Sequence, residues 1–318
     1  MIAYLWTPAL VSRTRLATLS LMKFLLLLIS LWVVAPANVR AKSPAQKDLR
    51  KAIQTMFGAS LPGSAVRVQR VNTSGEDVAE ASAEVEAVFR AKAIDGHWRL
   101  SEVRTGQDTW ERLDLIAQAL RTNLPEGRCD APSQSPRDPS PLAMTVKRAR
   151  CLVAELLGVT LPSDRVRIKD LSSLDLPFGS ESSALIESTI QLDLRFARDT
   201  RGWRVSELKT GNRDWTNLDT FATAFNEAKH DSAANDLATI GHALMDFRRA
   251  RGSFVISDKE SVLIDHLSPR YLTKVIRVDP WHRPYQYDGE PDRFSLRSLG
   301  PDGKPNTPDD IVLSGPTP

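Results

Sequence analysis

The sequence predicts an α+β fold in which two related modules of helices and antiparallel strands precede a C-terminal domain. Two observations carry this prediction. A long segment recurs within the chain, and each copy passes from helical spacing of apolar residues to strict alternation of apolar and polar residues. We expect the modules at residues 46–124 and 146–228, a Pro/Ser-rich linker at 125–145 and the C-terminal domain at 232–318. The polar stretch at 229–234 is expected to form the boundary between the second module and the C-terminal domain.

The internal repeat is visible by direct comparison within the chain. The run FGASLP at 57–62 recurs as LGVTLP at 157–162, and WRLSEVRTG at 98–106 recurs as WRVSELKTG at 203–211. The offset between the copies grows by five residues between these two matches. The second copy therefore carries a longer turn around 171–183. Two copies make paired modules, because a solenoid needs about three or more repeats.

Each copy predicts the same order of elements. A helix comes first, and a glycine, Gly58 or Gly158, stands where it would end. A short strand follows, and then a longer strand whose period of two indicates an antiparallel sheet with one solvated face. The turns at 95–96 and 201–202 lead into a third strand. A second helix closes each module, near 108–122 in the first copy and 214–228 in the second.

Residues shared by the two copies are candidates for function. Glu102 and Glu207 fall on the strand face that also carries a tryptophan, where a partly buried carboxylate would have a raised pKa and could act as a general acid or base. A carboxylate that reaches water at a strand end is the structural alternative, which we favour because no His or Cys recurs beside it. The repeated tryptophans form either core anchors, which we favour, or a platform for peptide or glycan: Trp98, Trp110, Trp203 and Trp215.

Residues 1–41 are typical of an export signal. Lys23 precedes an apolar run at 24–34, and small residues at 35–41 offer a cleavage site. The run is shorter than the roughly 20 apolar residues that span a bilayer. Met22 is a possible true start. We expect cleavage and export to the periplasm or beyond; the alternative is an uncleaved segment that anchors the protein in the membrane.

Composition limits the classes of function. The net charge of +3 is spread along the chain, and neither a basic block nor a nucleic-acid motif occurs, so we expect no nucleic-acid partner. The five histidines lack zinc-ligand spacing, and no nucleotide-binding or hydrolase motif is present, which favours a non-enzymatic protein. Cys129 and Cys151 fit an oxidising compartment. We favour a disulfide between them, with two unpaired thiols as the alternative.

The run SLGPDGKPNTPDDI at 298–311 concentrates charge in a short loop. Asp302, Asp309 and Asp310 place three carboxylates among glycines and prolines that favour tight turns. Such carboxylates repel one another unless a cation lies between them, and Ca²⁺ takes about six to eight oxygen ligands. An acidic surface turn would use the same residues. The spacing is not that of an EF-hand.

The residues around this loop carry a resemblance to a known family. DPWHRPYQY at 279–287 precedes a strand-like run and the loop, and Asp279 is expected to accept hydrogen bonds from the backbone of its own turn. An amphipathic helix comes before them, Gly252 stands where it would end, and its apolar face consists of Leu237, Ile240, Leu244 and Phe247. This order resembles the C-terminal domain of the major, G-type pseudopilin of type II secretion, over about residues 232–314. The family has a long hydrophobic N-terminal helix that builds its filament. No such helix precedes Asn235, so we do not expect a standard pseudopilus subunit.

The resemblance also implies a ligand set. In that family the loop binds calcium, which implies that the Leu299 carbonyl and the carboxylates of Asp302, Asp309 and Asp310 bind a structural Ca²⁺ here. His282 stands where members of the family often have Gly. If that position has a positive φ, the histidine is strained there.

The sequence therefore predicts an exported, non-enzymatic envelope protein with a calcium-stabilised, pseudopilin-like domain. It would be a structural or interaction component related to type II secretion or to pilus-like assemblies, with proteins of the cell envelope as partners. The alternative is an exported protein that binds peptide or glycan on its repeat sheets. A weaker third interpretation is a hydrolase that uses Glu102 or Glu207.

Overall fold

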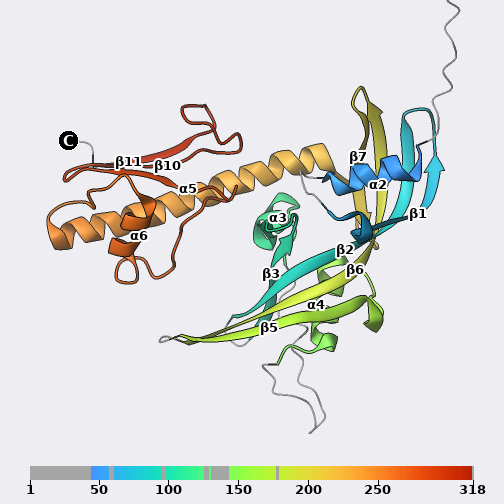
Figure 1. Cartoon of the computed structure of the whole chain (residues 1–318), viewed down its shortest axis with the longest axis horizontal. Helices are drawn as coiled ribbons and strands as arrows, with labels where there is room; N and C mark the ends of the chain where they lie inside the picture. The colour runs from blue at the N-terminus through green and yellow to red at the C-terminus, as the bar shows by residue number, and fades with distance from the viewer. Residues whose placement is uncertain are drawn as a thin grey trace, which may run out of the picture. The chain divides into compact units, whose positions relative to one another are not determined.

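The computed structural model describes residues 44–56, 61–94, 97–124, 129, 143–176 and 179–316. The predicted signal segment, Gly58, the turn at 95–96 and most of the linker lie outside the described residues. Helices and antiparallel sheets make up the described part, so the α+β class is as predicted (Figure 1).

The two repeat segments contain the same order of elements. The first comprises α2 (Gln46–Gln54), η2 (Gly63–Ala65), β1 (Val66–Thr73), β2 (Val78–Ile94), β3 (His97–Arg104), β4 (Trp110–Arg112) and α3 (Leu113–Ala119). The second comprises α4 (Val146–Leu157), η4 (Ser163–Arg165), β5 (Val166–Leu176), β6 (Gly179–Asp199), β7 (Gly202–Thr210), β8 (Thr216–Asn217) and the start of α5 (Leu218–Arg251). The rest comprises α6 (Glu260–Leu267), β9 (Gln286–Gly289), β10 (Phe294–Ser298) and β11 (Ile311–Gly315).

Local sequence explains where the helices begin and end. The Thr145 hydroxyl accepts a hydrogen bond from the backbone of Arg148 at the start of α4, and Asn217 caps α5 in the same way. Gly158 ends α4 with φ +67°, and Gly252 ends α5 with φ +85°. Glycine adopts this left-handed conformation without steric cost, so both helices end where the sequence predicted.

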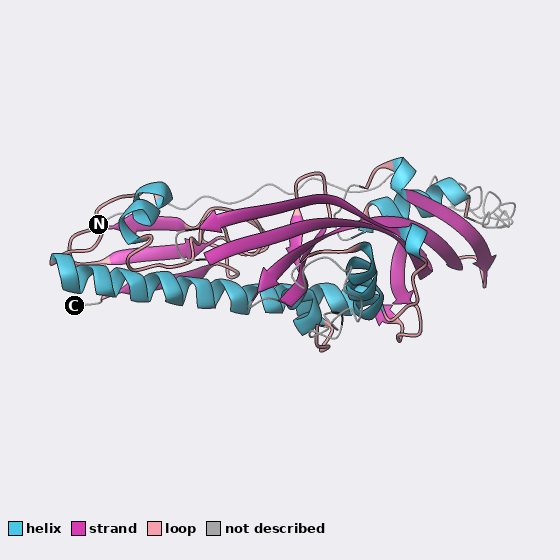
Figure 2. Ribbon diagram, turned by 90° about the horizontal axis from the view of Figure 1, so that it is seen from below, coloured by secondary structure: helices cyan, strands magenta, loops and turns pink. Residues whose placement is uncertain are grey.

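The strands of the two segments form one sheet, whereas the sequence led us to expect two separate modules. β2 pairs with β6 in antiparallel fashion from Val78↔Ala197 to Lys92↔Ser183, and the long strands lie side by side in both ribbon views (Figures 1 and 2). β1 and β3 share the other edge of β2, and β5 and β7 share the other edge of β6. The outcome is an eight-stranded sheet.

The register of β2 on β6 matches small side chains to large ones. Ala79 lies opposite Phe196, and Ala81 lies opposite Leu194. All four side chains are buried. A small residue facing a large one fills the layer beneath the covering helices without a void. The alternation was visible in the sequence, but this complementarity between the two copies was not part of the prediction.

The first helix of each segment also contacts the other segment. α2 packs on β1 and on β7, and its Leu49 and Ile53 join a core with side chains of β2 and β6. α4 packs on β5 and on β3, and its Leu152 and Val153 join a second core that includes Trp98. Each core therefore needs residues from both copies.

The predicted boundary at 229–234 is wrong. These residues lie inside α5, which runs without a break for 34 residues from the edge of the repeat sheet into the C-terminal part. The stretch looks polar because α5 is exposed on one side there, while Ala228 and Ala233 are buried on the other. Polar residues on one face are compatible with a continuous helix.

The C-terminal part packs a small sheet against the second half of α5 (Figure 1). The sheet has the order β11-β10-β9 and is antiparallel. The apolar face that the sequence predicted for this helix forms the core with α6, β9 and β10. It consists of Leu237, Ile240, Leu244 and Phe247.

We expect Ile53→Ala to lower the free energy of unfolding of the whole repeat sheet by about 2–5 kcal/mol, since Ile53 is fully buried between the two copies. Urea unfolding followed by circular dichroism measures the change. Lys51→Ala, on the exposed face of the same helix, is the control and should change stability by less than about 0.5 kcal/mol. Equal effects of the two substitutions would contradict the shared core.

Candidate calcium loop and the contacts around it

The acidic loop joins β10 to β11 and is shaped by its glycines. Gly300 and Gly303 have φ of +59° and +67°. A Cβ added at Gly300 would clash with the backbone carbonyl of Asp309, and one at Gly303 would clash with the guanidinium of Arg283. The amide of Gly303 donates to the carbonyl of Leu299 at 3.1 Å. The predicted ligands therefore lie in a tight loop whose backbone requires glycine at positions 300 and 303.

All three predicted carboxylates bind backbone amides of the loop. Asp302 accepts a hydrogen bond from the amide of Lys304 at 2.8 Å. Asp309 accepts one from the amide of Asp302 at 3.1 Å. The hydroxyl of Thr307 and then the Asp302 amide hold the pKa of Asp309 below its usual range. Asp309 therefore stays ionised, as a cation ligand must.

The third carboxylate is the least exposed. Asp310 is 7% exposed, accepts a hydrogen bond from the amide of Asn306 at 2.7 Å and lies 3.7 Å from the guanidinium of Arg297. The hydroxyl oxygen of Thr307 lies 3.4 Å from a carboxylate oxygen of Asp302 and 3.5 Å from one of Asp310. Thr307, which the sequence analysis did not single out, thus lies among the predicted ligands.

The donors suit calcium in kind, but their spacing is wider than a bound ion requires. All are hard oxygens, and Ca²⁺ binds such oxygens at about 2.3–2.6 Å. Within the described residues, one group of three His, Cys, Asp or Glu side chains brings its ligand atoms within 4.8 Å of one another, and it is not this trio. Calcium at Leu299, Asp302, Asp309 and Asp310 stays a prediction.

The hairpin at 279–285 supports the loop. Asp279 is 2% exposed and accepts hydrogen bonds from the amides of Trp281 and Arg283 and from the hydroxyl of Ser298. The sequence predicted that this aspartate binds the backbone of its own turn. Arg283 donates to the loop carbonyls of Gly300 and Pro301. The hairpin therefore fixes the start of the loop through both a buried carboxylate and a guanidinium.

Residues 220–314 match the model of one protein family. The family is type II secretion system (T2SS), protein G. The matched residues, called the protein-G-like segment below, begin within α5, earlier than the resemblance at 232–314 had suggested. No curated protein and no solved structure matches the chain. The match supports a role related to type II secretion.

The repeated glutamates are bound by repeated arginines. Arg90 donates to Glu102, and Arg195 donates to Glu207 at 2.8 Å. Each guanidinium also lies over a tryptophan ring, Arg90 at 4.2 Å from the centroid of Trp110 and Arg195 at 4.0 Å from that of Trp215. An arginine, a glutamate and a tryptophan thus contact one another in the same way in each copy. These contacts give a structural reason for the repetition of the three residues. Arg90 and Arg195 are separated by the same number of residues as the two glutamates. The sequence could therefore have indicated an Arg–Glu pair in each copy.

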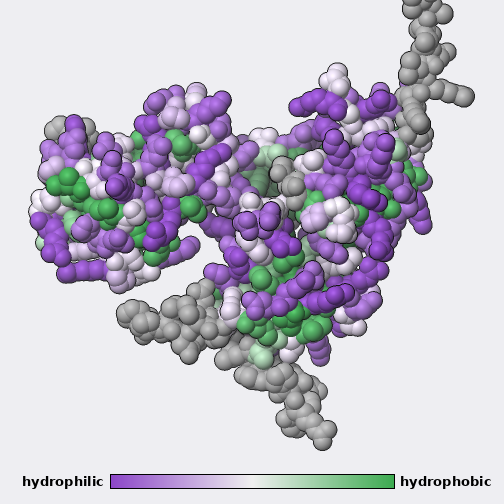
Figure 3. Space-filling view, viewed as in Figure 1, coloured by the Kyte–Doolittle hydropathy of each residue, from purple (hydrophilic) through white to green (hydrophobic). Residues whose placement is uncertain are grey.

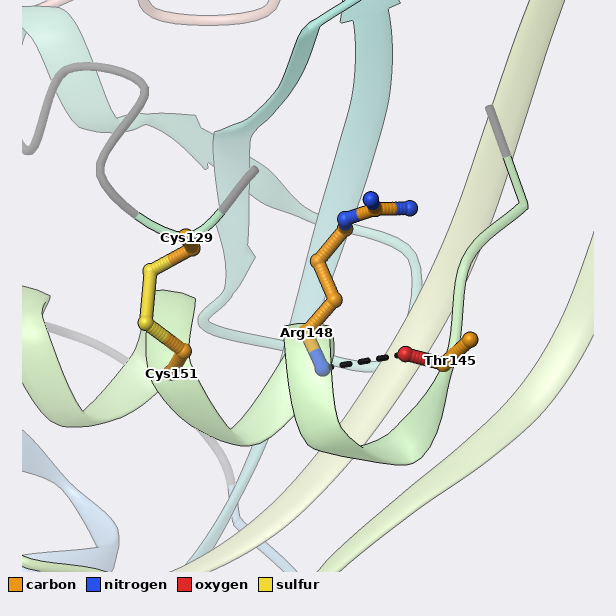
Figure 4. The surroundings of a disulfide bond; sticks show 4 residues. All are labelled: Cys129, Thr145, Arg148 and Cys151. Carbon is orange, nitrogen blue, oxygen red and sulfur yellow. Dashed lines mark hydrogen bonds between the residues drawn. A yellow bond between two sulfur atoms is a disulfide. The ribbon is translucent and has the colours of Figure 1, made fainter. Parts of the chain in front are cut away.

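The two cysteines form the favoured disulfide. Figure 4 shows Cys129 bonded to Cys151 on α4. Their Cα atoms lie 5.7 Å apart, an ordinary distance for a disulfide. Glu155 is the third member of the close group described above. Because both sulfurs are in a disulfide, the group has no thiolate to bind a metal.

A second cluster, which the sequence analysis missed, joins β4 to α5 and to the hairpin. Lys229 is buried, and its Nζ lies 2.9 Å from each carboxylate oxygen of Glu111. Nε2 of His282 lies 3.3 Å from the same carboxylate. Burial acts to raise the pKa of Glu111, but the contacts with His282 and Lys229 outweigh it and leave the pKa below its ordinary value.

The face of the molecule that Figure 3 draws is mostly polar. On the face that Figure 3 shows, hydrophilic residues dominate and hydrophobic ones gather in small patches. Exposed single hydrophobic residues are ordinary on protein surfaces. Among the described helices, none has the length and apolar character needed to cross a membrane.

Acid should remove the contribution of Glu111 to stability. Because the folded-state pKa is below the ordinary value of about 4.5, the contribution is fully present above that pH and is lost as the pH falls through the folded-state pKa. We expect the difference in unfolding free energy between the native protein and Glu111→Gln to be constant near neutral pH and to shrink below about pH 4. Urea unfolding across this pH range measures it; a constant difference down to about pH 3 would contradict the prediction.

Proposed function

We propose that this protein is an exported, non-enzymatic component of the cell envelope that acts with proteins of type II secretion or of a related pilus-like assembly. The observation that carries the proposal is the match of residues 220–314 to protein G of the type II secretion system. The signal-like sequence at 1–41 and the disulfide support export, since disulfides persist in oxidising compartments.

The repeat sheet in this proposal is a scaffold that contacts other proteins. The rival binding function relied on exposed tryptophans. Trp98 is buried in a core, and Trp110 and Trp215 lie against arginines. The weaker enzymatic interpretation relied on Glu102 and Glu207, which are held in ion pairs with arginines. These contacts favour a structural role for the repeated residues.

Calcium belongs to the proposal as a stabiliser of the loop. An ion that binds the folded loop and not the unfolded chain stabilises the fold by mass action. Asp302, Asp309 and Asp310 supply carboxylates, Leu299 supplies a carbonyl, and Arg283 holds the neighbouring carbonyls from the hairpin side. Binding would draw the carboxylates closer together than they are in the structure. Their mutual repulsion without an ion supports an ion as the group that would offset it.

Removing calcium should lower the melting temperature of the protein. With a dissociation constant of about 10⁻⁴ M, typical of extracellular modules, about 2 mM calcium adds roughly 2 kcal/mol. That corresponds to roughly 4–8 °C in a protein of this size. Calorimetry in EGTA and in calcium measures the shift.

The double variant Asp302→Asn with Asp309→Asn should melt at the same temperature in both conditions. Asp258→Asn is the matched control, because Asp258 is an exposed acid of the same segment outside the loop. It should keep the full calcium response. An unchanged midpoint of the native protein in EGTA and in calcium would remove calcium from the proposal while leaving the secretion-related role open to its own test.

The secretion-related role is tested by capture from the envelope. The tagged protein, cross-linked in cells of its own source and purified from solubilised envelopes, should carry secretion-system proteins identified by mass spectrometry. The Asp302→Asn, Asp309→Asn variant should recover fewer of them if the loop shapes the contact surface. The absence of every secretion-system protein from the native capture, in cells that express the system, would reject the proposed role.

A further inference from the structure

We propose that the contact among β4, α5 and the hairpin at 279–285 is a fixed joint, which makes the repeat sheet and the protein-G-like segment a single rigid body. In this joint His282 is the positioning residue, since it brings the hairpin to Glu111. The proposal concerns the construction of this chain and does not depend on calcium or on the identity of any partner.

The centre of the joint is a buried ion pair. The side chains of Lys229 and Glu111 are 7% and 15% exposed, and both carboxylate oxygens lie 2.9 Å from the ammonium nitrogen. Lys229 also lies 4.6 Å from the centroid of the Phe225 ring. A buried charge that loses its partner is far more costly than an exposed one, because it stays desolvated without compensation. Any movement of α5 away from β4 would break this pair.

Further contacts surround the pair on both sides. The guanidinium of Arg112 donates to the hydroxyl of Ser232 at 3.0 Å. The hydroxyl of Tyr285 donates a hydrogen bond to Asp236 at 3.0 Å. Burial, and to a smaller extent the Asp236 carboxylate, raises the pKa of the tyrosine. α3, which follows β4 directly, packs on α5. The joint thus combines one buried ion pair, two hydrogen bonds and a helix–helix contact.

His282 adopts a backbone conformation that suits glycine. Its φ is +67°, in the left-handed region that is sterically unfavourable for residues other than glycine. Its ring nitrogen lies 3.3 Å from the Glu111 carboxylate. A glycine at 282 would relieve the backbone but would leave Glu111 without this contact. The His282 side chain therefore supplies a contact with Glu111 that glycine could not make.

The two repeat copies differ at the joint. β4 has the sequence Trp-Glu-Arg, and the corresponding residues of the second copy are Trp215, Thr216 and Asn217. In the first copy the two charged residues, Glu111 and Arg112, contact α5. In the second copy Asn217 caps the start of α5. The copies keep the tryptophan and diverge at the positions that reach α5, which indicates that the charged pair serves a contact specific to the first copy.

The consequence is a fixed geometry between two surfaces. α5 starts at β8, passes the joint and ends in the C-terminal core, so both parts are built on one helix. A partner held by the repeat sheet and another held by the protein-G-like segment would then keep a constant distance and angle. A flexible tether would not provide this.

The test is cooperativity of unfolding in the full chain, measured by calorimetry at neutral pH and constant calcium. The native protein should melt in one transition, and Glu111→Gln should melt in two that are separated by about 5 °C or more. Glu84→Gln is the matched control: Glu84 lies on β2, is 14% exposed and pairs with Arg165 of η4, and neither residue contacts the joint. That variant should melt earlier than the native protein but still in one transition.

Hydrogen exchange of residues 228–236 provides a second measurement. His282→Asn should speed exchange there by about threefold or more, since asparagine tolerates the left-handed backbone but cannot reach Glu111. Two transitions in the native protein, or the same single transition for Glu111→Gln and Glu84→Gln, would overturn the proposal. If Glu111→Gln does not fold, unchanged exchange in His282→Asn overturns it.

Discussion

The pairing of β2 with β6 along their whole common length governs the rest of the structure. A strand has two edges, and β6 occupies one edge of β2 from Val78 to Lys92. β1 and β3 must therefore share the other edge, and the same holds for β5 and β7 on β6. The pairing of β2 with β6 joins the strands of the two copies into one sheet, and each core takes side chains from both copies.

The same constraint determines what α5 can touch. β4 and β8 end opposite sides of the sheet order, and α5 begins directly after β8. α5 contacts β8 and β7 and, at Lys229, Glu111 on β4 before it enters the C-terminal core. A helix can do so while its backbone groups remain bonded internally, whereas a loop would need other partners for them. The continuity of α5 and the buried Lys229–Glu111 pair are thus two parts of one arrangement.

Local features were predictable from sequence, and long-range ones were not. The ends of α4 and α5 followed from Gly158 and Gly252, and the buried face of α5 followed from its periodicity. The partner of a strand does not follow from alternation, because any apolar row suits any facing row of similar volume. The boundary predicted at 229–234 was wrong because a lysine is usually exposed, whereas Lys229 is buried in an ion pair with Glu111. The Arg90–Glu102 contact had a signal in the repeat, since its counterpart, Arg195–Glu207, lies at the same offset.

The acidic loop shows why residue type alone does not separate a metal site from a turn. Backbone amides bind the carboxylates of Asp302, Asp309 and Asp310, so the loop has a stable arrangement built from its own donors. A carboxylate has about four lone-pair sites and can accept an amide while binding a cation. The two interpretations therefore differ in the distance between the carboxylates. A bound cation would stabilise carboxylates that lie close together, whereas without a cation their mutual repulsion keeps them apart. With or without an ion, the backbone amides hold each carboxylate in the loop. An ion would therefore only need to shorten the distances between carboxylates that are already positioned.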